Sequence, residues 1–252
     1  MKILFMGRKQ VSANLLRFLT KQDHIEIVGV LTDSHLQGSP TTAAAQELGL
    51  PLYTFDTALE AMREGRLKYD LGLSVLYWRK LRDEFLSIPT LGTINFHPAL
   101  LPEYKGTGGY NLAIMDELDQ WGNTAHYVDA SIDTGEIIEV DRFPIDAETE
   151  TAQSLERKTM QALEPFAQRI IARAIESKTK LPTTPNIGGR YVSRDEMEAM
   201  KQILDGDNIE KKIRAFWFPP YDGAYVEING QKYTLINRQL LEEVAPKDST
   251  SL

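Results

Sequence analysis

Two side chains with the chemistry for acyl transfer stand two positions apart at the end of an apolar run. Asn95 and His97 lie in the stretch 93–106, where the alternation of a β-strand places both on the same side. Pro98 follows at once and stops strand pairing. An imidazole beside an amide is well placed to move a proton and to polarise a carbonyl, although a lone histidine there is more often a satisfied core residue.

A carboxylate follows in a glycine-containing turn between two later apolar runs. Asp133 belongs to the sequence D-T-G-E-I, and a carboxylate there can orient an imidazole and raise its basicity. Spacing alone does not establish that Asp133 reaches His97. His126, on the apolar run before this turn, is interpreted as a core histidine bonded to a neighbour.

Strand-like and helical patterns alternate over the first two-thirds of the chain. This alternation predicts an α/β fold with a Rossmann-like, mostly parallel sheet, and ligands of such sheets bind at the carboxyl ends of the strands. A proline at 165 predicts a kink in the longest helix. The predicted strands are 3–6, 25–31, 71–76, 92–96, 124–128 and 137–140, and the predicted helices begin near Ser12 and cover 41–49, 109–118 and 151–177.

The chain changes character after residue 180, so we expect a catalytic domain over 1–180. Residues 181–206 contain a proline- and glycine-rich stretch and are predicted to be a linker or crossing segment. Residues 207–252 are predicted to form a small tail with a helix at 207–215, a β-hairpin that turns at Asn229-Gly230, and a polar, frayed end. One isolated hairpin is barely stable unless something covers it, which favours a homodimer through the tail.

Composition excludes several classes of protein. The chain has 252 residues, 42% of them hydrophobic and 25% charged, as in ordinary globular proteins. It has no cysteine, which excludes thiolate nucleophiles and sulfur-ligated zinc and fits a cytoplasmic location. No apolar run approaches the roughly 18 residues of a membrane span. The net charge of −8 counts against a nucleic-acid partner.

The first strand–helix turn carries a basic pair. Gly7 is the only glycine of this turn, which therefore lacks the glycine motifs of nicotinamide dehydrogenases and P-loop enzymes. Arg8 and Lys9 stand at the carboxyl end of the first strand. They either meet an anionic ligand at the adjacent helix start or form a solvated pair.

Two motifs together carry a resemblance to a known family. N-x-H-P-x-L-L-P-x-Y-K-G at 95–106, followed by D-x-x-x-D-T-G-x-I at 129–137, resembles the formyltransferases that use 10-formyltetrahydrofolate. The resemblance covers roughly residues 1–175 and implies that Asn95, His97 and Asp133 are the catalytic trio. His97 then acts as general base, or as an imidazolium that stabilises the oxyanion, and no metal is required.

The resemblance also implies where the formyl donor binds. In that family the pterin ring is held largely through backbone, beside a strand-end loop and the loop before the catalytic aspartate. The matching cofactor-binding positions here are Val75, Leu76, Tyr77, Ile132 and Asp133. Tyr77 and the neighbouring Trp78 are either close to the pterin or packed in the ordinary way.

Three acceptor classes compete within the family. A tRNA acceptor is disfavoured, because residues 190–252 hold nine Lys or Arg against eleven Asp or Glu, and residues 31–62, with the short loop 33–38, hold no Lys or Arg. Glycinamide ribonucleotide formyltransferases resemble the catalytic part alone, so 214–236 would have no role. The tail motif R-A-x-x-x-P-P-x-x-G-A with a hairpin resembles the amino-sugar N-formyltransferases.

We therefore expect a nucleotide-linked amino sugar as acceptor, with dTDP-4-amino-4,6-dideoxyglucose as best guess, for O-antigen or lipopolysaccharide synthesis. Lys105 and the glycine turn after it suit a diphosphate, unless the glycines merely allow the turn. The aromatic residues 216–221 either seal the tail or stack on a base. A non-catalytic homologue that binds folate or nucleotide sugar is the other alternative, and the intact trio speaks against it. The predicted substrate-binding residues are Arg8, Lys9, Tyr104, Lys105, Gly106, Thr107, Gly108, Gly109, Trp217 and Tyr221.

Overall fold

The computed structural model describes residues 1–32 and 38–244. Positions 33–37 of the predicted short loop and 245–252 of the predicted frayed end lie outside the described residues. The chain forms two compact units that interleave along the sequence, and each is described by itself. The first unit contains residues 1–105, 122–142 and 159–190, and the second contains 106–121, 143–158 and 191–252.

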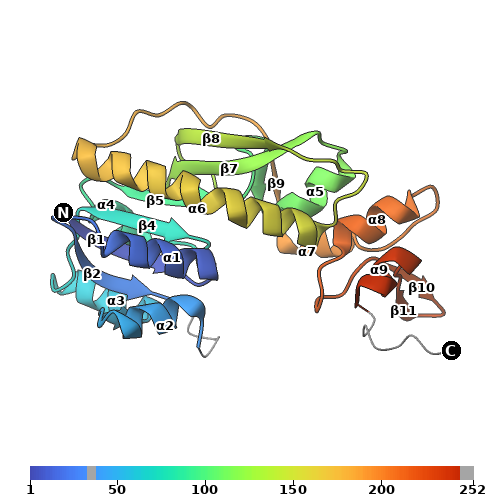
Figure 1. Ribbon diagram of the computed structural model, residues 1–252, viewed down its shortest axis with the longest axis horizontal. Coiled ribbons are helices and arrows are strands. Elements are labelled where there is room, and N and C mark those ends of the chain that lie inside the picture. Colours follow the sequence, from blue (N-terminus) through green and yellow to red (C-terminus); the bar gives the residue numbers. More distant parts are fainter. Residues whose placement is uncertain (33–37, 245–252) are drawn as a thin grey trace. The chain divides into compact units, whose positions relative to one another are not determined.

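A seven-stranded sheet, most of it in the first unit, has the order β3-β2-β1-β4-β5-β7-β8 (Figure 1). The pairs among β1 to β5 are parallel, and β5 pairs with β7 in the antiparallel sense. The predicted fold class is therefore confirmed. The strands are β1 (Lys2–Gly7), β2 (Glu26–Leu31), β3 (Leu52–Tyr53), β4 (Leu71–Val75), β5 (Thr93–His97), β7 (Gln120–Tyr127) and β8 (Ile137–Pro144).

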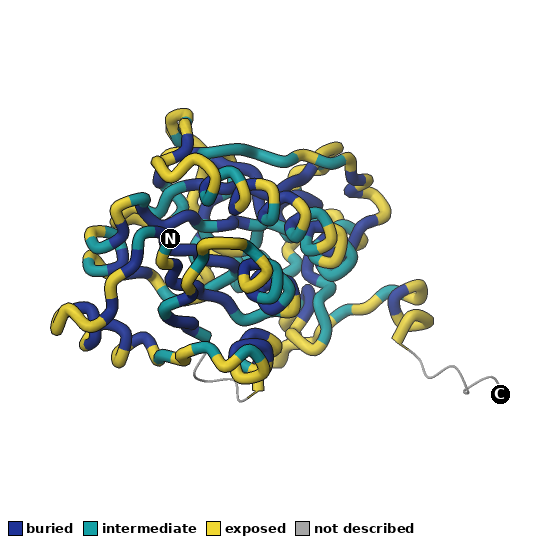
Figure 2. The backbone as a smooth tube through the Cα atoms, turned by 60° about the vertical axis from the view of Figure 1, so that its left-hand side comes forward, coloured by how far each residue is buried: buried dark blue, intermediate teal, exposed yellow. Residues whose placement is uncertain are grey.

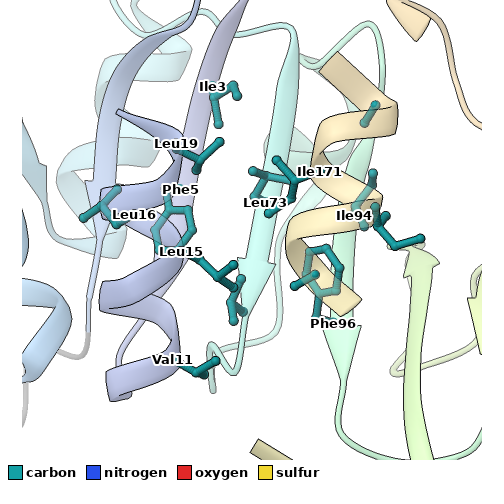
Figure 3. Close-up of a cluster of buried hydrophobic side chains, with 14 of the residues drawn as sticks. Ile3, Phe5, Val11, Leu15, Leu16, Leu19, Leu73, Ile94, Phe96 and Ile171 are labelled. Carbon is teal, nitrogen blue, oxygen red and sulfur yellow. The ribbon is translucent and has the colours of Figure 1, made fainter. Parts of the chain in front are cut away.

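Apolar side chains pack on both faces of this sheet. Because successive side chains of a strand point to opposite faces, β1 contributes Ile3 and Phe5 to one cluster and Leu4 and Met6 to the other. The first cluster is completed by helices α1 (Gln10–Leu19) and α6 (Ala152–Ser177), as Figure 3 shows for ten labelled residues. The second is completed by α3 (Phe55–Arg63) and α4 (Asp83–Ser87). Every residue of β4 is buried, and buried stretches of the chain are dark blue in Figure 2.

Local signals explain where most helices begin. Helix α2 (Pro40–Glu47) starts with Ser39, whose hydroxyl accepts a hydrogen bond from the Thr42 amide, and with a proline in its first turn. Helix α3 was not predicted, because its capping box pairs Thr54 with Thr57 instead of the usual glutamate or glutamine. Helix α6 has 26 residues and continues through Pro165, and the kink there stays a prediction.

Strand β7 is longer than predicted. It begins at Gln120, whereas the apolar run suggests a start at residue 124. The additional residues include Asn123, which is fully buried although it is polar. Its Nδ2 donates to the Thr159 carbonyl at 3.3 Å. A search for apolar runs misses the start of such a strand, because a buried polar side chain interrupts the run.

The second unit carries the predicted hairpin. β10 and β11 pair in the antiparallel sense around Asn229 and Gly230, whose positive φ angles are those of a type I′ turn. Helix α5 is joined to α8 by a 2.6 Å hydrogen bond from Asn111 Nδ2 to the Ala215 carbonyl. The elements are α5 (Gly109–Met115), α7 (Arg194–Ala199), α8 (Ile209–Phe216), β10 (Tyr225–Ile228), β11 (Gln231–Thr234) and α9 (Arg238–Val244), and β6 (Tyr104–Gly106) pairs with β9 (Arg190–Val192) where the chain passes between units.

The predicted linker 181–206 contains secondary structure of its own, β9 and α7. Helix α7 begins with a capping box between Ser193 and Glu196. In the part of the chain that the structure describes, no helix has both the length and the hydropathy needed to cross a bilayer.

Candidate active site

Strand β5 turns Asn95 and His97 to the same face of the sheet. Phe96 between them is buried in the first cluster, so alternation directs the two polar side chains away from that cluster. The antiparallel pairing with β7 places Asn95 opposite His126. Side chains opposite each other in such a pair lie on one face within contact distance.

A hydrogen bond of 3.0 Å joins Asn95 Nδ2 to His126 Nε2. The second ring nitrogen of His126, Nδ1, lies 2.8 Å from the carbonyl oxygen of Tyr127. Because a carbonyl only accepts, Nδ1 carries the proton, and Nε2 of the neutral ring accepts from the Asn95 amide. This arrangement fixes the orientation of the amide and leaves its second N–H for another acceptor.

His97 is held by a backbone carbonyl and faces a carboxylate. Its Nε2 donates to the Tyr104 carbonyl oxygen at 2.9 Å, so Nδ1 is the basic nitrogen of the neutral ring. Nδ1 lies 3.6 Å from Asp133 Oδ2, and the other carboxylate oxygen lies 3.6 Å from His126 Nε2. The structure therefore brings Asp133 to His97, which spacing alone does not establish.

Burial sets the protonation of His97. It lowers the pKa of the imidazole below its ordinary value, because the charged ring loses hydration. The Asp133 carboxylate and the Tyr104 carbonyl act in the opposite direction and raise the pKa, while His126 lowers it further. A ring that is neutral at neutral pH and faces a carboxylate can accept a proton and then be stabilised as an ion pair.

A short loop between β7 and β8 presents Asp133. The residue has a φ of +55°, a left-handed conformation that is uncommon outside glycine and that asparagine and aspartate adopt more readily than other residues. Asp129 organises the loop, since its Oδ1 accepts from the Ser131 amide at 3.0 Å and from the Thr134 hydroxyl at 2.6 Å. Gly135 permits the return of the chain, because a Cβ there would lie 1.8 Å from the Tyr127 carbonyl oxygen.

The positions expected to hold the pterin lie beside this site. Val75 is the last residue of β4 and pairs with Phe96 of β5. Leu76 follows with a positive φ, and Tyr77 packs against the second hydrophobic cluster. Two apolar side chains are exposed here, Trp78 at 52% and Ile132 at 42%.

Similarity to known proteins decides the family. A sequence profile described as formyl transferase matches residues 1–171. The chain belongs to the formyl transferase family. The match confirms the family that the two motifs suggest, and with it the assignment of the chain as a formyl-group transferase.

Individual relatives of this formyltransferase differ in what their names say they act on. Methionyl-tRNA formyltransferase from Lysinibacillus sphaericus is 29% identical over 241 residues, which cover 88% of this chain and 74% of that protein. A 4-N formyltransferase from Francisella tularensis has a TM-score of 0.77 at 20% identity, over 93% of this chain and 96% of that chain. An N-formyltransferase from Helicobacter canadensis, solved with folinic acid and dTDP-3-aminofucose, has a TM-score of 0.72 at 24% identity, over 92% and 86%.

Four of the predicted substrate-binding residues lie in the first unit of the formyltransferase. Arg8 and Lys9 directly follow Gly7, which pairs with Val75, so they lie at the sheet edge that carries the site. Tyr104 contributes its carbonyl to His97, and the Arg190 guanidinium lies 5.3 Å from its ring centre.

Lys105 is buried, and its Nζ donates to the Gly188 carbonyl at 2.7 Å. This contact gives the ammonium a structural partner, and the role of Lys105 on a diphosphate stays a prediction.

The other predicted substrate-binding residues lie in the second unit. The Thr107 amide donates to the Val192 carbonyl at 2.8 Å, and Gly109 begins α5. Trp217 ends α8, and its carbonyl accepts from the Gln153 amide at 3.1 Å. Tyr221 is 68% exposed. The roles of these residues, and of Gly106 and Gly108 with their positive φ angles, stay predictions.

His126 has a larger place in the site than the sequence suggests. The interpretation as a core histidine holds in part, since the residue is 2% exposed and bonded to the Tyr127 carbonyl. It also contacts Asn95 and lies close to Asp133. The signal that finds this role is the strand register, because only the pairing of β5 with β7 puts His126 opposite Asn95.

Proposed function

We propose that this formyltransferase moves a formyl group from N10-formyltetrahydrofolate to the amine of a nucleotide-linked amino-deoxysugar, best dTDP-4-amino-4,6-dideoxyglucose, in the cytoplasm, for O-antigen or other surface polysaccharide. The observation that carries the proposal is the convergence of Asn95, His97 and Asp133 around one buried face of β5 in a chain of this family. An amide donor, a neutral imidazole and a carboxylate are the groups that formyl transfer to an amine requires.

The donor supplies a formyl carbon that is already activated as an amide of N10. Its flat pterin fits an apolar surface with backbone polar groups, which the loop after β4 and the Asp133 loop provide, with Trp78 and Ile132 exposed. The likeness to the Helicobacter canadensis enzyme, solved with folinic acid, supports this donor. The residues proposed to hold it are Val75, Leu76, Tyr77, Ile132 and Asp133.

Asn95 acts on the formyl oxygen. One of its N–H groups is bonded to His126, and the second donates to the oxygen as negative charge develops on it. A donor that is oriented before the reaction stabilises this charge without reorganising.

His97 transfers the proton of the acceptor amine, and Asp133 assists this transfer. As the C–N bond to the acceptor forms and the bond to N10 breaks, the amine proton passes to Nδ1 of His97 and from there to N10 of the departing folate. Nε2 stays bonded to the Tyr104 carbonyl throughout, and the Asp133 carboxylate stabilises the imidazolium.

The acceptor is argued from charge and from likeness. The tail 190–252 is acidic, with nine basic against eleven acidic residues, which disfavours a phosphate backbone. The likeness to the 4-N formyltransferase covers 93% of this chain and therefore extends into the tail. The alternative, a methionyl-tRNA acceptor, is favoured by the sequence relatives at 29% identity and below.

One experiment separates these acceptors. The purified chain is given N10-formyltetrahydrofolate with dTDP-4-amino-4,6-dideoxyglucose, its 3-amino isomer, a GDP-linked amino sugar, glycinamide ribonucleotide or methionyl-tRNA, and formylated product is measured by mass spectrometry. We expect product with a dTDP-amino sugar and kcat/KM at least about 10²-fold lower with the others, since a site built for a polar group rejects analogues that lack it. Product from methionyl-tRNA alone would replace the proposal. Binding of dTDP-amino sugar and folate without product from any acceptor would indicate a binding protein.

Replacing His126 tests how Asn95 is oriented. His126→Leu removes the acceptor for the Asn95 amide, and we expect kcat to fall about 10- to 10²-fold, because a small misplacement of a catalytic group costs that much. His126→Gln keeps an acceptor oxygen and is expected to retain more activity than the leucine variant. Equal losses in both variants, measured with the same substrates, would show that the imidazole itself is needed.

Homodimerisation through the tail is part of the proposal. The hairpin β10–β11 has exposed apolar side chains, among them Ile228 at 54% and Tyr233 at 45%. A two-stranded sheet is marginal by itself, so burial of these side chains against a second copy would stabilise it.

A further inference from the structure

The stretch that connects α6 to β9 passes the catalytic loop. In Figure 1 this connection leaves α6 and runs past β8, and an isolated bridge joins Thr184 to Ile137, the first residue of β8. We call residues 181–190 the crossing segment. The sequence predicts that it is part of a linker. Its backbone and side chains nevertheless contact the segments that contain Asp133 and Tyr104, the two residues that lie beside the ring nitrogens of His97.

Asn186 of the crossing segment binds the Asp133 loop through its side chain. Its Nδ2 donates to the Asp133 carbonyl at 3.0 Å and to the Gly135 carbonyl at 2.8 Å. If the Asn186 side-chain amide were turned by 180°, its oxygen would face two carbonyl oxygens. The two carbonyls of the Asp133 loop therefore determine the orientation of this amide. The Asn186 Oδ1 is buried and has no hydrogen-bond partner among the described residues, so these two carbonyls are what its amide binds.

Asn186 binds the backbone of the residue that carries the carboxylate, Asp133. Asp133 has a positive φ, a sparsely populated conformation that surrounding contacts help to maintain. Asn186 holds the carbonyl of Asp133 itself and that of Gly135, two residues further on. The direction of the Asp133 side chain toward His97 Nδ1 depends on this backbone.

The crossing segment also contacts the chain around Tyr104, whose carbonyl binds His97 Nε2. Gly189 approaches so closely that a Cβ there would lie 1.6 Å from the Pro102 carbonyl oxygen, and the Arg190 amide donates to the Glu103 carbonyl at 3.0 Å. Lys105 Nζ binds the Gly188 carbonyl. Tyr104 between these contacts supplies the carbonyl that holds His97 Nε2.

We propose that Asn186 is a positioning residue, which fixes the Asp133 carboxylate against His97 by holding the backbone of the Asp133 loop. The inference rests on the proposed function, since it assumes that His97 and Asp133 carry the reaction. It assigns a catalytic purpose to a segment that has the composition of a linker.

The test uses the full-length protein with Asn186→Leu, which keeps the branched shape but has no N–H, and Asn186→Gln, which keeps the amide. Thr183→Val is the matched control in the same segment, because the Thr183 hydroxyl binds the Glu136 side chain and not the Asp133 loop backbone. We expect the leucine variant to lose about 10- to 10²-fold in kcat with a smaller change in KM, the glutamine variant to recover part of the loss, and the control to match wild type.

A second readout needs no acceptor. The pKa of His97 is measured by NMR titration of its imidazole Cε1–H, assigned with a His97→Gln variant. The titratable groups that face His97 are Asp133 and His126, and the Asp133 carboxylate raises the pKa of His97. Displacing that carboxylate must therefore lower the pKa of His97 in Asn186→Leu and leave it unchanged in Thr183→Val.

The two readouts distinguish the possible failures. Unchanged kcat and unchanged His97 titration in Asn186→Leu would overturn the positioning role. A variant that only melts earlier, with both quantities as in wild type below its Tm, would also overturn it. If the wild type transfers formyl to no acceptor, the proposed function fails, while a lowered His97 pKa in Asn186→Leu would still support the link from Asn186 to Asp133.

Discussion

Replacing His97 by alanine is expected to lower kcat/KM for formyl transfer by about 10²- to 10⁴-fold, the usual contribution of a positioned acid–base group. His97 Nδ1 is the basic nitrogen that faces Asp133, because Nε2 is committed to the Tyr104 carbonyl. No other imidazole of the described site can substitute, since His126 Nε2 already accepts from Asn95. The rate is measured with N10-formyltetrahydrofolate and the acceptor identified in the panel.

Chemical rescue makes this prediction specific. The alanine variant leaves a cavity beside Asp133 and the Tyr104 carbonyl, and added imidazole can occupy it with one nitrogen on each. We expect imidazole to restore part of the activity of His97→Ala. The control is His24→Asn, because His24 is exposed and has a positive φ that asparagine accepts. A His97→Ala protein that is folded by circular dichroism and fully active would contradict the proposed mechanism.

The fold was predictable where local pattern and burial agree. Residues 3–6 of β1 are apolar and buried, and every residue of β4 is buried although Ser74 is polar, as in strands of a parallel sheet, so both runs are visible in the sequence. β7 begins four residues before the predicted start at 124, because the buried polar Asn123 interrupts the apolar run. The hairpin was found from Asn229-Gly230, whose backbone requirement is local.

The sequence predicts which residues form the site, but it does not predict the distance between His97 and Asp133. Asn95 and His97 share a strand, so their common face follows from alternation. The distance between His97 and Asp133 depends on a loop return that Gly135 permits and Asn186 holds, and no spacing rule contains it. Contacts such as these, made across large sequence separations, are created by tertiary packing.

Replacing Asp133 by asparagine is the second change with a large expected effect. The substitution is nearly isosteric, so the loop and its hydrogen bonds to Asn186 are expected to remain. An amide at this position can direct an N–H to His97 Nδ1 and occupy the lone pair that must take the proton. We expect kcat to fall by about 10²- to 10⁴-fold, the usual contribution of a positioned acid–base group.

The direction in which the pKa of His97 changes distinguishes a direct effect of Asp133→Asn from unfolding. Burial lowers the pKa and the Asp133 charge raises it, so Asp133→Asn must lower the pKa of His97 further, while loss of catalysis through simple unfolding would return it toward its ordinary value of about 6.5. We therefore expect a large fall in kcat together with a lower His97 pKa by NMR, in a protein whose Tm is close to that of wild type. Glu136→Gln, three residues along the same chain segment, is the control for loss of a negative charge near the loop. If Asp133→Asn retained kcat within about tenfold of wild type, the imidazolium would not need the carboxylate, and His97 would act with the stabilisation of the Tyr104 carbonyl alone.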